Sequence, residues 1–76
     1  MENAIIFLPS ATGTVRWFDT ARGHGFVTRD GGGPDCFVHQ SSIRPEDQRR
    51  VEEGTRLGYD VLEDLGGPSA VNILLL

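Results

Sequence analysis

The chain has 76 residues, a formal net charge of −4 and 38% hydrophobic residues, and its seven basic residues are all arginines. This length fits one domain near the lower limit for folding alone, with only a modest core. The acidic balance argues against tight nonspecific binding of duplex nucleic acid, which depends largely on neutralised phosphates.

Cysteine content and the N-terminus indicate the compartment. A single cysteine excludes an internal disulfide framework, and this fits a reducing, cytoplasmic setting. Residue 2 is Glu2 rather than the start of a basic cluster, and residues 4–8 supply only five consecutive apolar side chains. That run is too short for a signal peptide or a membrane span, so we expect no membrane partner.

Short β-prone runs punctuated by glycine and proline predict an all-β domain. The five strands are expected at residues 14–19, 24–29, 35–40, 56–63 and 70–75. The run Gly31-Gly32-Gly33-Pro34 should close the hairpin between the second and third strands, because glycine accepts the positive φ of such turns. The charged segment 44–54 is expected to be a long loop, with a short helical turn beginning at Pro45.

Ring side chains recur on one face of the second and third predicted strands. Alternation along a strand places His24 and Phe26 on one face and, on the next strand, Phe37 and His39. The other face receives the apolar side chains of Val27, Cys36 and Val38. A cluster of exposed rings usually marks a binding site. The alternative is that Phe26 and Phe37 are core residues.

A cation and two more aromatic side chains precede these strands, at Arg16-Trp17-Phe18. Stacking of a base on an aromatic side chain contributes about 1–3 kcal/mol and tolerates any sequence, and a nearby cation can follow the phosphates. The combination predicts a partner of single-stranded RNA or DNA.

Several segments together resemble the cold-shock domain family. They are Thr12–Asp19, Arg22–Val27, Asp35–His39, Ser41–Ile43, Glu52–Gly54, Gly67-Pro68 and Ala70–Asn72. The order and spacing of so many motifs make the resemblance specific, from about Thr12 to the C-terminus. It implies a five-stranded antiparallel OB-type β-barrel that binds single strands, acting as an RNA chaperone or a regulator of gene expression. The domain would then occupy residues 12–76, after an apolar extension at residues 1–11.

The resemblance also implies a set of binding residues. The nucleic-acid-binding residues expected from it are Arg16, Trp17, Phe18, Arg22, His24, Phe26, Phe37, His39 and Gln40. Three positions where the family usually carries an aromatic residue hold His24, Gln40 and Gln48, and Gly66 stands where many members have a basic residue. Since each lost stacking partner costs about 1–3 kcal/mol, we expect at least tenfold weaker binding, or a shorter footprint, than in a fully aromatic member.

The two histidines have competing interpretations. His24 is either a stacking ring that becomes a cation at mildly acidic pH or an ordinary surface histidine. In the first case binding strengthens from about pH 7.5 to 5.5. His39 is expected to stack on a base or to donate a hydrogen bond to one. A metal site formed with Cys36 is not expected, because strand parity sends Cys36 to the other face.

Catalysis and cofactors are not expected. The chain shows no nucleophile with a neighbouring base, no paired carboxylates and no phosphate-binding loop, and the triple glycine lacks the Lys and Ser/Thr of a P-loop. Cys36 is interpreted as a small buried apolar residue rather than a redox switch.

The two apolar ends of the chain suggest a second function class. Val71, Ile73 and Leu75 are predicted to point inward, so Leu74 and Leu76 would point outward. The segment Ile5–Leu8 could cover those leucines, extend the sheet or exchange between two molecules, which would give a homodimer through Ile5–Leu8 and Leu74–Leu76. The alternative function is therefore protein association by a barrel whose binding face is silent.

Overall fold

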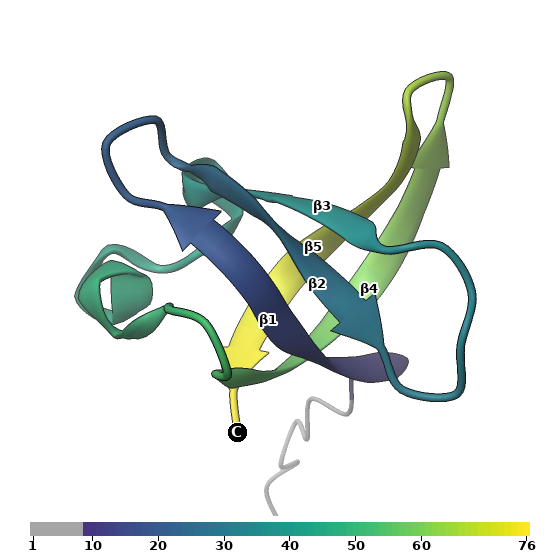
Figure 1. Cartoon of the computed structure of the whole chain (residues 1–76), viewed down its shortest axis with the longest axis horizontal. Coiled ribbons are helices and arrows are strands. Elements are labelled where there is room, and N and C mark those ends of the chain that lie inside the picture. The colour runs from purple at the N-terminus through teal and green to yellow at the C-terminus, as the bar shows by residue number, and fades with distance from the viewer. Residues whose placement is uncertain (1–8) are drawn as a thin grey trace, which may run out of the picture.

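Five strands close into a small barrel in the computed structural model, which describes residues 9–76 except the side chain of Asp64 (Figure 1). The strands are β1 (Ala11–Asp19), β2 (His24–Arg29), β3 (Cys36–His39), β4 (Arg56–Asp64) and β5 (Gly67–Leu75), and two 3-10 helices, η1 (Gln40–Ser42) and η2 (Pro45–Arg50), separate β3 from β4. The strand order around the barrel is β1-β2-β3-β5-β4. All pairings are antiparallel except the contact between β3 and β5, where Phe37 pairs in parallel with Ser69. The predicted OB-type fold is confirmed.

The inside of the barrel is filled by one cluster of buried apolar side chains. It contains Val15, Val27, Cys36, Val38, Ile43, Val51, Leu57, Tyr59, Ala70 and Ile73. The predicted underside of β2 and β3 is confirmed, since Val27 and Cys36 are fully buried and Val38 is 1% exposed. The Tyr59 hydroxyl lies inside this cluster and donates a hydrogen bond to the Thr12 carbonyl oxygen, at 3.3 Å. Its polar atom is thereby satisfied in an apolar setting.

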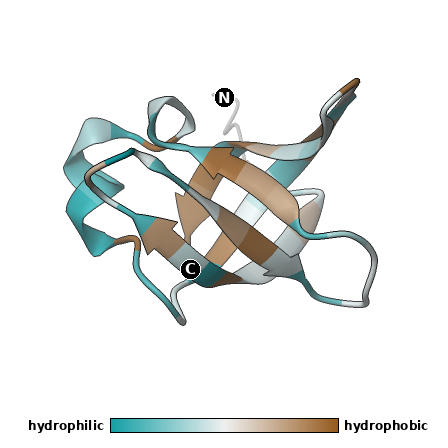
Figure 2. Cartoon of the chain, turned by 45° about the horizontal axis from the view of Figure 1, so that its top comes forward, coloured by the Kyte–Doolittle hydropathy of each residue, from teal (hydrophilic) through white to brown (hydrophobic). Residues whose placement is uncertain are grey.

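The five strands lie where they are predicted, but several begin or end at different residues. β1 begins at Ala11 and β5 at Gly67, three residues before the expected starts in both cases. β3 stops at His39, because Gln40 already begins η1. The helical turn expected at Pro45 is confirmed as η2. Figure 2 shows that the helical connection is largely hydrophilic, whereas the strands carry hydrophobic bands between hydrophilic ones.

One predicted side-chain direction on β5 is wrong. Ala70 and Ile73 are buried, whereas Val71 pairs with Asp60 and lies outside the core cluster. The cause is a register shift beside Asn72, whose φ of 54° is in the left-handed region. This bulge adds a residue and reverses the alternation, so an inward Val71 is incompatible with an inward Ile73.

The C-terminal leucines follow the prediction beyond that bulge. Leu75 packs against the core, Leu74 is half-buried opposite Gly58, and Leu76 is 63% exposed. The amide of Leu76 donates to the Arg56 carbonyl oxygen at 3.1 Å, so the end of the chain is tied to β4. The segment Ile5–Leu8 lies outside the described residues. Within residues 9–76, no helix has the length and apolar character needed to cross a membrane.

A polar network ties β1, β4 and the end of β2 together on the barrel surface. Asp30 accepts hydrogen bonds from both terminal nitrogens of Arg56, at 2.8 and 2.6 Å, and from the Thr12 hydroxyl at 2.6 Å. The Arg56 and Thr12 hydrogen bonds lower the pKa of Asp30 from its ordinary value of 3.8 to about 2. A carboxyl group with a depressed pKa stabilises the fold above pH 3.8 and loses that contribution as the pH falls through 2.

Asp30→Asn should therefore lower the thermal unfolding midpoint at pH 6 and make it less sensitive to acid. The difference between the wild type and the variant should shrink between pH 4 and pH 2, because the wild-type carboxyl is protonated in that window. Thermal melts followed by circular dichroism at several pH values measure both effects. Glu53→Gln, at an exposed loop position, is the matched control. A difference in unfolding midpoint between the wild type and Asp30→Asn that stays constant down to pH 2 would contradict the stabilising role of the Asp30 carboxylate.

Candidate nucleic-acid interface

Five ring side chains form one continuous cluster on the outside of β1, β2 and β3. Trp17 pairs with Phe26 and Phe26 with Phe37, so three rings lie in a row across three strands. Beside this row of rings, His24 on β2 pairs with His39 on β3. Successive ring centroids lie 5.5 Å apart for Trp17 and Phe26, 5.7 Å for Phe26 and Phe37, and 6.4 Å for Phe37 and His39. The strands therefore bring together the ring residues that alternation predicted.

These rings are partly accessible instead of packed into the core. Trp17 is 41% exposed and His39 is exposed, while His24, Phe26 and Phe37 are half-buried by one another. The alternative interpretation of Phe26 and Phe37 as core residues is therefore wrong. Half-buried rings keep one another in place while leaving faces and edges free for a ligand, which lowers the ordering cost of binding.

A β-bulge explains how Trp17 reaches this surface. Val15 pairs with Val27 and points into the barrel, and strict alternation would send Trp17 inward as well. The register shifts between Val15 and Trp17, with Arg16 as the extra residue. The shift rotates Trp17 to the outside, next to Phe26.

Tight backbone contact accompanies the bulge. A Cβ atom on Gly25 would collide with the Trp17 carbonyl oxygen and would come within 2.8 Å of the Phe18 Cα. Only glycine allows β1 and β2 to approach this closely. The absence of a side chain at Gly25 therefore leaves room for the β1 backbone at Trp17 and Phe18.

His39 has a defined hydrogen-bonding state. Its Nδ1 accepts a hydrogen bond from the Ser41 amide at 3.1 Å and lies 2.8 Å from the Ser41 hydroxyl. Because Nδ1 acts as an acceptor, the neutral ring carries its proton on Nε2. His39 can then offer both a ring surface and an N–H donor to a ligand.

Both arginines near the rings have carboxylate partners. Arg16 forms an ion pair with Asp35 at 2.8 Å, and Arg22 lies 3.8 Å from Asp19. Their side chains remain 66% and 79% exposed, so both can also reach a ligand. The sequence indicated the arginines but not the Arg16–Asp35 pair, because 19 residues separate the partners and no local pattern links them.

The sequence of this chain is similar to those of known proteins. The model of the "cold-shock" DNA-binding domain matches residues 11–76. The chain belongs to the cold-shock domain family. It is 44% identical to the cold shock protein ScoF of Streptomyces coelicolor over 63 residues, which cover 83% of this chain and 94% of that protein. It is 44% identical to the cold shock-like protein CspA of Stigmatella aurantiaca, over 83% of this chain and 93% of that protein. Identity to the cold shock protein CspV of Vibrio cholerae is 43%, over 86% of this chain and 93% of that protein.

Besides the two arginines, two expected binding residues lie outside the ring cluster of this cold-shock domain. Phe18 is half-buried and packs against the core, on the opposite side of β1 from Trp17. Gln40 is exposed, and its side-chain amide lies against Gly23, where it would be 2.6 Å from a Cβ atom at that glycine. Gln40 therefore borders the ring surface at the end near His39 without adding a ring to it.

Gln48 has a structural role in this cold-shock domain. Its Nε2 donates hydrogen bonds to the carbonyl oxygens of Gln40 and Ile43, both at 3.1 Å. These bonds fasten η2 to the segment that follows β3. The amide thus fixes the loop at the edge of the ring surface, a role that sequence spacing did not reveal.

Proposed function

We propose that this cold-shock domain binds single-stranded RNA or DNA by stacking bases on the surface formed by Trp17, His24, Phe26, Phe37 and His39. The observation that carries the proposal is the continuous contact of these five rings on the outside of the barrel. Bases paired inside a duplex do not present their faces, so a stacking surface selects unpaired bases. Family membership supports nucleic-acid binding as the general activity.

Binding at this surface is passive. The ring cluster holds bases that become unpaired by thermal opening, and each stacked base contributes about 1–3 kcal/mol. Mass action then shifts weakly paired RNA toward its open form. This is the action of an RNA chaperone or of a regulator that acts by altering RNA structure, and it requires no catalytic group.

Electrostatics limit the affinity and its dependence on salt. Arg16 and Arg22 flank the rings, and each has a carboxylate close by. For single strands the logarithm of the affinity falls by about 0.7 per phosphate contact for each tenfold rise in salt. Two contacts give a slope of about −1.4, which is shallow for a nucleic-acid-binding protein.

The proposal is tested with the fluorescence of Trp17, the only tryptophan in the chain. Titration with a heptathymidine strand at fixed salt should quench the emission, because a base stacks on the exposed indole. Poly-adenylate and a blunt duplex of the same length serve as comparisons, and the duplex should quench least. Unchanged emission at millimolar single strand would overturn the proposal and favour the alternative, protein association through the ends of the barrel.

Gln40→Phe should strengthen binding by about tenfold. The position borders the rings beside His39, and a phenylalanine there supplies one further stacking partner worth about 1–3 kcal/mol. Isothermal titration with the same heptathymidine measures the change. Gln40→Leu is the matched control, because it adds apolar area without an aromatic face. Equal affinities for wild type and Gln40→Phe would show that polar residues at the rim do not weaken this domain.

A further inference from the structure

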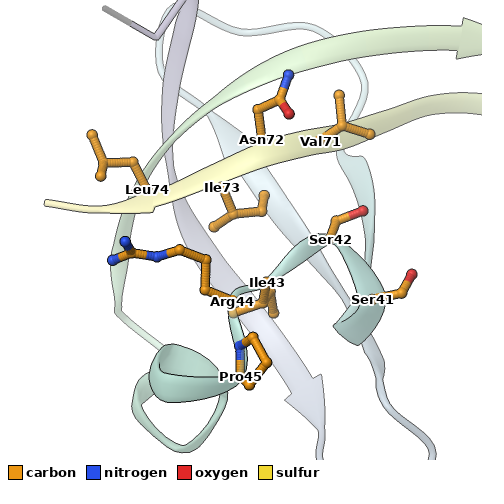
Figure 3. Close-up of a pocket in the computed structure, with 9 residues that line it drawn as sticks. All are labelled: Ser41, Ser42, Ile43, Arg44, Pro45, Val71, Asn72, Ile73 and Leu74. Atoms are coloured by element: carbon orange, nitrogen blue, oxygen red, sulfur yellow. The ribbon is translucent and has the colours of Figure 1, made fainter. Parts of the chain in front are cut away.

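A groove lies between β5 and the segment that follows β3, and Ser41 on its rim donates its amide to His39 of the ring cluster at 3.1 Å. The lining of the groove combines the apolar side chains of Ile43, Val71, Ile73 and Leu74 with the polar Ser42 and Asn72 (Figure 3). Its volume is about 850 Å³. Buried Ile43 and Ile73 form its floor, while Val71 and Leu74 are half-buried beside it. The volume is within the range of about 300–1,000 Å³ that is typical of occupied clefts.

The path of the chain before β1 leads toward this groove. Ala11 pairs with Tyr59, so a regular continuation of β1 would place Pro9 opposite Val61. Pro9 instead lies over Gly58, with its Cγ 2.6 Å from the place of a Cβ atom on that glycine. The chain has therefore left the edge of β1 and crosses the outer face of β4.

Two contacts fix this crossing. The Ser10 hydroxyl donates a hydrogen bond to the Asp60 carboxylate at 2.9 Å, and the Ser10 amide reaches the same oxygen at 3.4 Å. Gly58 leaves room for the proline ring, since any side chain at that position would collide with it. The position of Pro9 is thus built into the fold.

The next strand along this path is β5. Leu74 is paired with Gly58, and a methyl group of Leu76 lies 3.5 Å from the same Cβ position that Pro9 covers. Neighbouring strands are about 4.8 Å apart, and an extended chain advances about 3.3 Å per residue. The four residues before Pro9 can therefore pass over Leu74 and reach the groove.

Those four residues are Ile5-Ile6-Phe7-Leu8, an apolar run that suits the apolar side of the groove, formed by Val71, Ile73 and Leu74. We propose that Ile5–Leu8 folds back across β4 and β5 of its own chain and occupies the groove beside Val71 and Leu74. The N-terminal extension is then an intramolecular arm that covers the apolar surface of β5. A homodimer through the same residues would be the exchanged form of this contact.

Disulfide trapping tests the arm directly. Phe7→Cys combined with Leu74→Cys, in a Cys36→Ala background, should form an intramolecular disulfide in a monomer under mild oxidation, because bridged Cα atoms lie about 4.4–6.8 Å apart. The matched control combines Phe7→Cys with Leu65→Cys, at the fully exposed tip of the β4–β5 hairpin, and should stay reduced. A disulfide-linked dimer, or no disulfide at all, would overturn the proposal.

Hydrogen exchange tests the proposed arm without any substitution in the core. Removal of residues 1–8 should accelerate amide exchange at residues 71–74 by at least tenfold and lower the unfolding midpoint by about 5–10 °C. Exchange at residues 24–29, on the ring face, should change much less. Identical exchange at 71–74 with and without the arm would contradict the proposal. Nucleic-acid binding is measured separately by Trp17 fluorescence, so the two proposals fail independently.

Discussion

Replacing Phe37 with alanine is expected to weaken binding of a heptathymidine strand by about 30- to 160-fold. Phe37 is the centre of the ring cluster, with contacts to His24, Phe26 and His39. Its removal deletes one stacking partner and also frees three neighbouring rings to move, so the loss of binding free energy should approach the upper part of the 1–3 kcal/mol range, about 2–3 kcal/mol. Fluorescence titration and calorimetry with Phe37→Ala provide the measurement.

The control for this experiment is Leu65→Ala, which removes an exposed apolar side chain from the tip of the β4–β5 hairpin, the apolar tip visible in Figure 2. It should leave affinity unchanged. Phe37→Ala should retain a cooperative thermal transition, because Phe37 points away from the core cluster. Wild-type affinity in a folded Phe37→Ala protein would exclude the ring cluster as the binding surface.

Gly25→Ala is expected to produce the largest loss of stability among single substitutions at glycines of the barrel. The new methyl group would overlap the Trp17 carbonyl oxygen and the Phe18 backbone, which are held by strand pairing and cannot rotate away. Overpacking of this kind costs about 1–3 kcal/mol, and each kcal/mol lowers the midpoint of a domain this small by about 4–8 °C. Thermal and urea unfolding measure the cost.

Gly31→Ala separates this clash from the backbone preference of glycine. A Cβ atom on Gly31 meets nothing within 4 Å, but its φ of 84° is unfavourable for alanine. The control should therefore cost only about 1 kcal/mol. Equal losses in the two variants would contradict the steric role of Gly25. Gly25→Ala should also shift the emission of Trp17, since the strained segment carries the indole.

The alternation of side chains predicted most of the ring surface and the part of the core that lies on β2 and β3. His24, Phe26, Phe37 and His39 lie on one face, as period-two patterns in short strands require. Such patterns succeed where a strand keeps its register, as β2 and β3 do. They fail where a residue is inserted into the register, because the insertion leaves no mark in hydropathy.

Val71 and the Arg16–Asp35 pair illustrate two limits of sequence-based prediction: a hidden shift in strand register and a contact between residues far apart in the chain. A left-handed Asn72 reverses the direction of Val71, although the sequence Val71-Asn72-Ile73 looks like a regular strand. The Arg16–Asp35 ion pair depends on how β1 and β3 approach one another across β2, a tertiary arrangement with no local signal. The sequence marks Gln48 only as a position without an aromatic ring, whereas in the structure its side-chain amide holds the loop through two hydrogen bonds.

The bulge at Arg16 gives β1 two opposite patterns of inward and outward residues in one strand. Before the bulge Val15 belongs to the barrel interior, and two positions later Trp17 belongs to the surface. Deleting Arg16 would leave a regular strand in which the valine still points inward and the tryptophan outward, because neighbouring residues of a strand take opposite faces. In comparisons among relatives, a one-residue gap at this point therefore marks a barrel that still displays the tryptophan but lacks the extra arginine beside it.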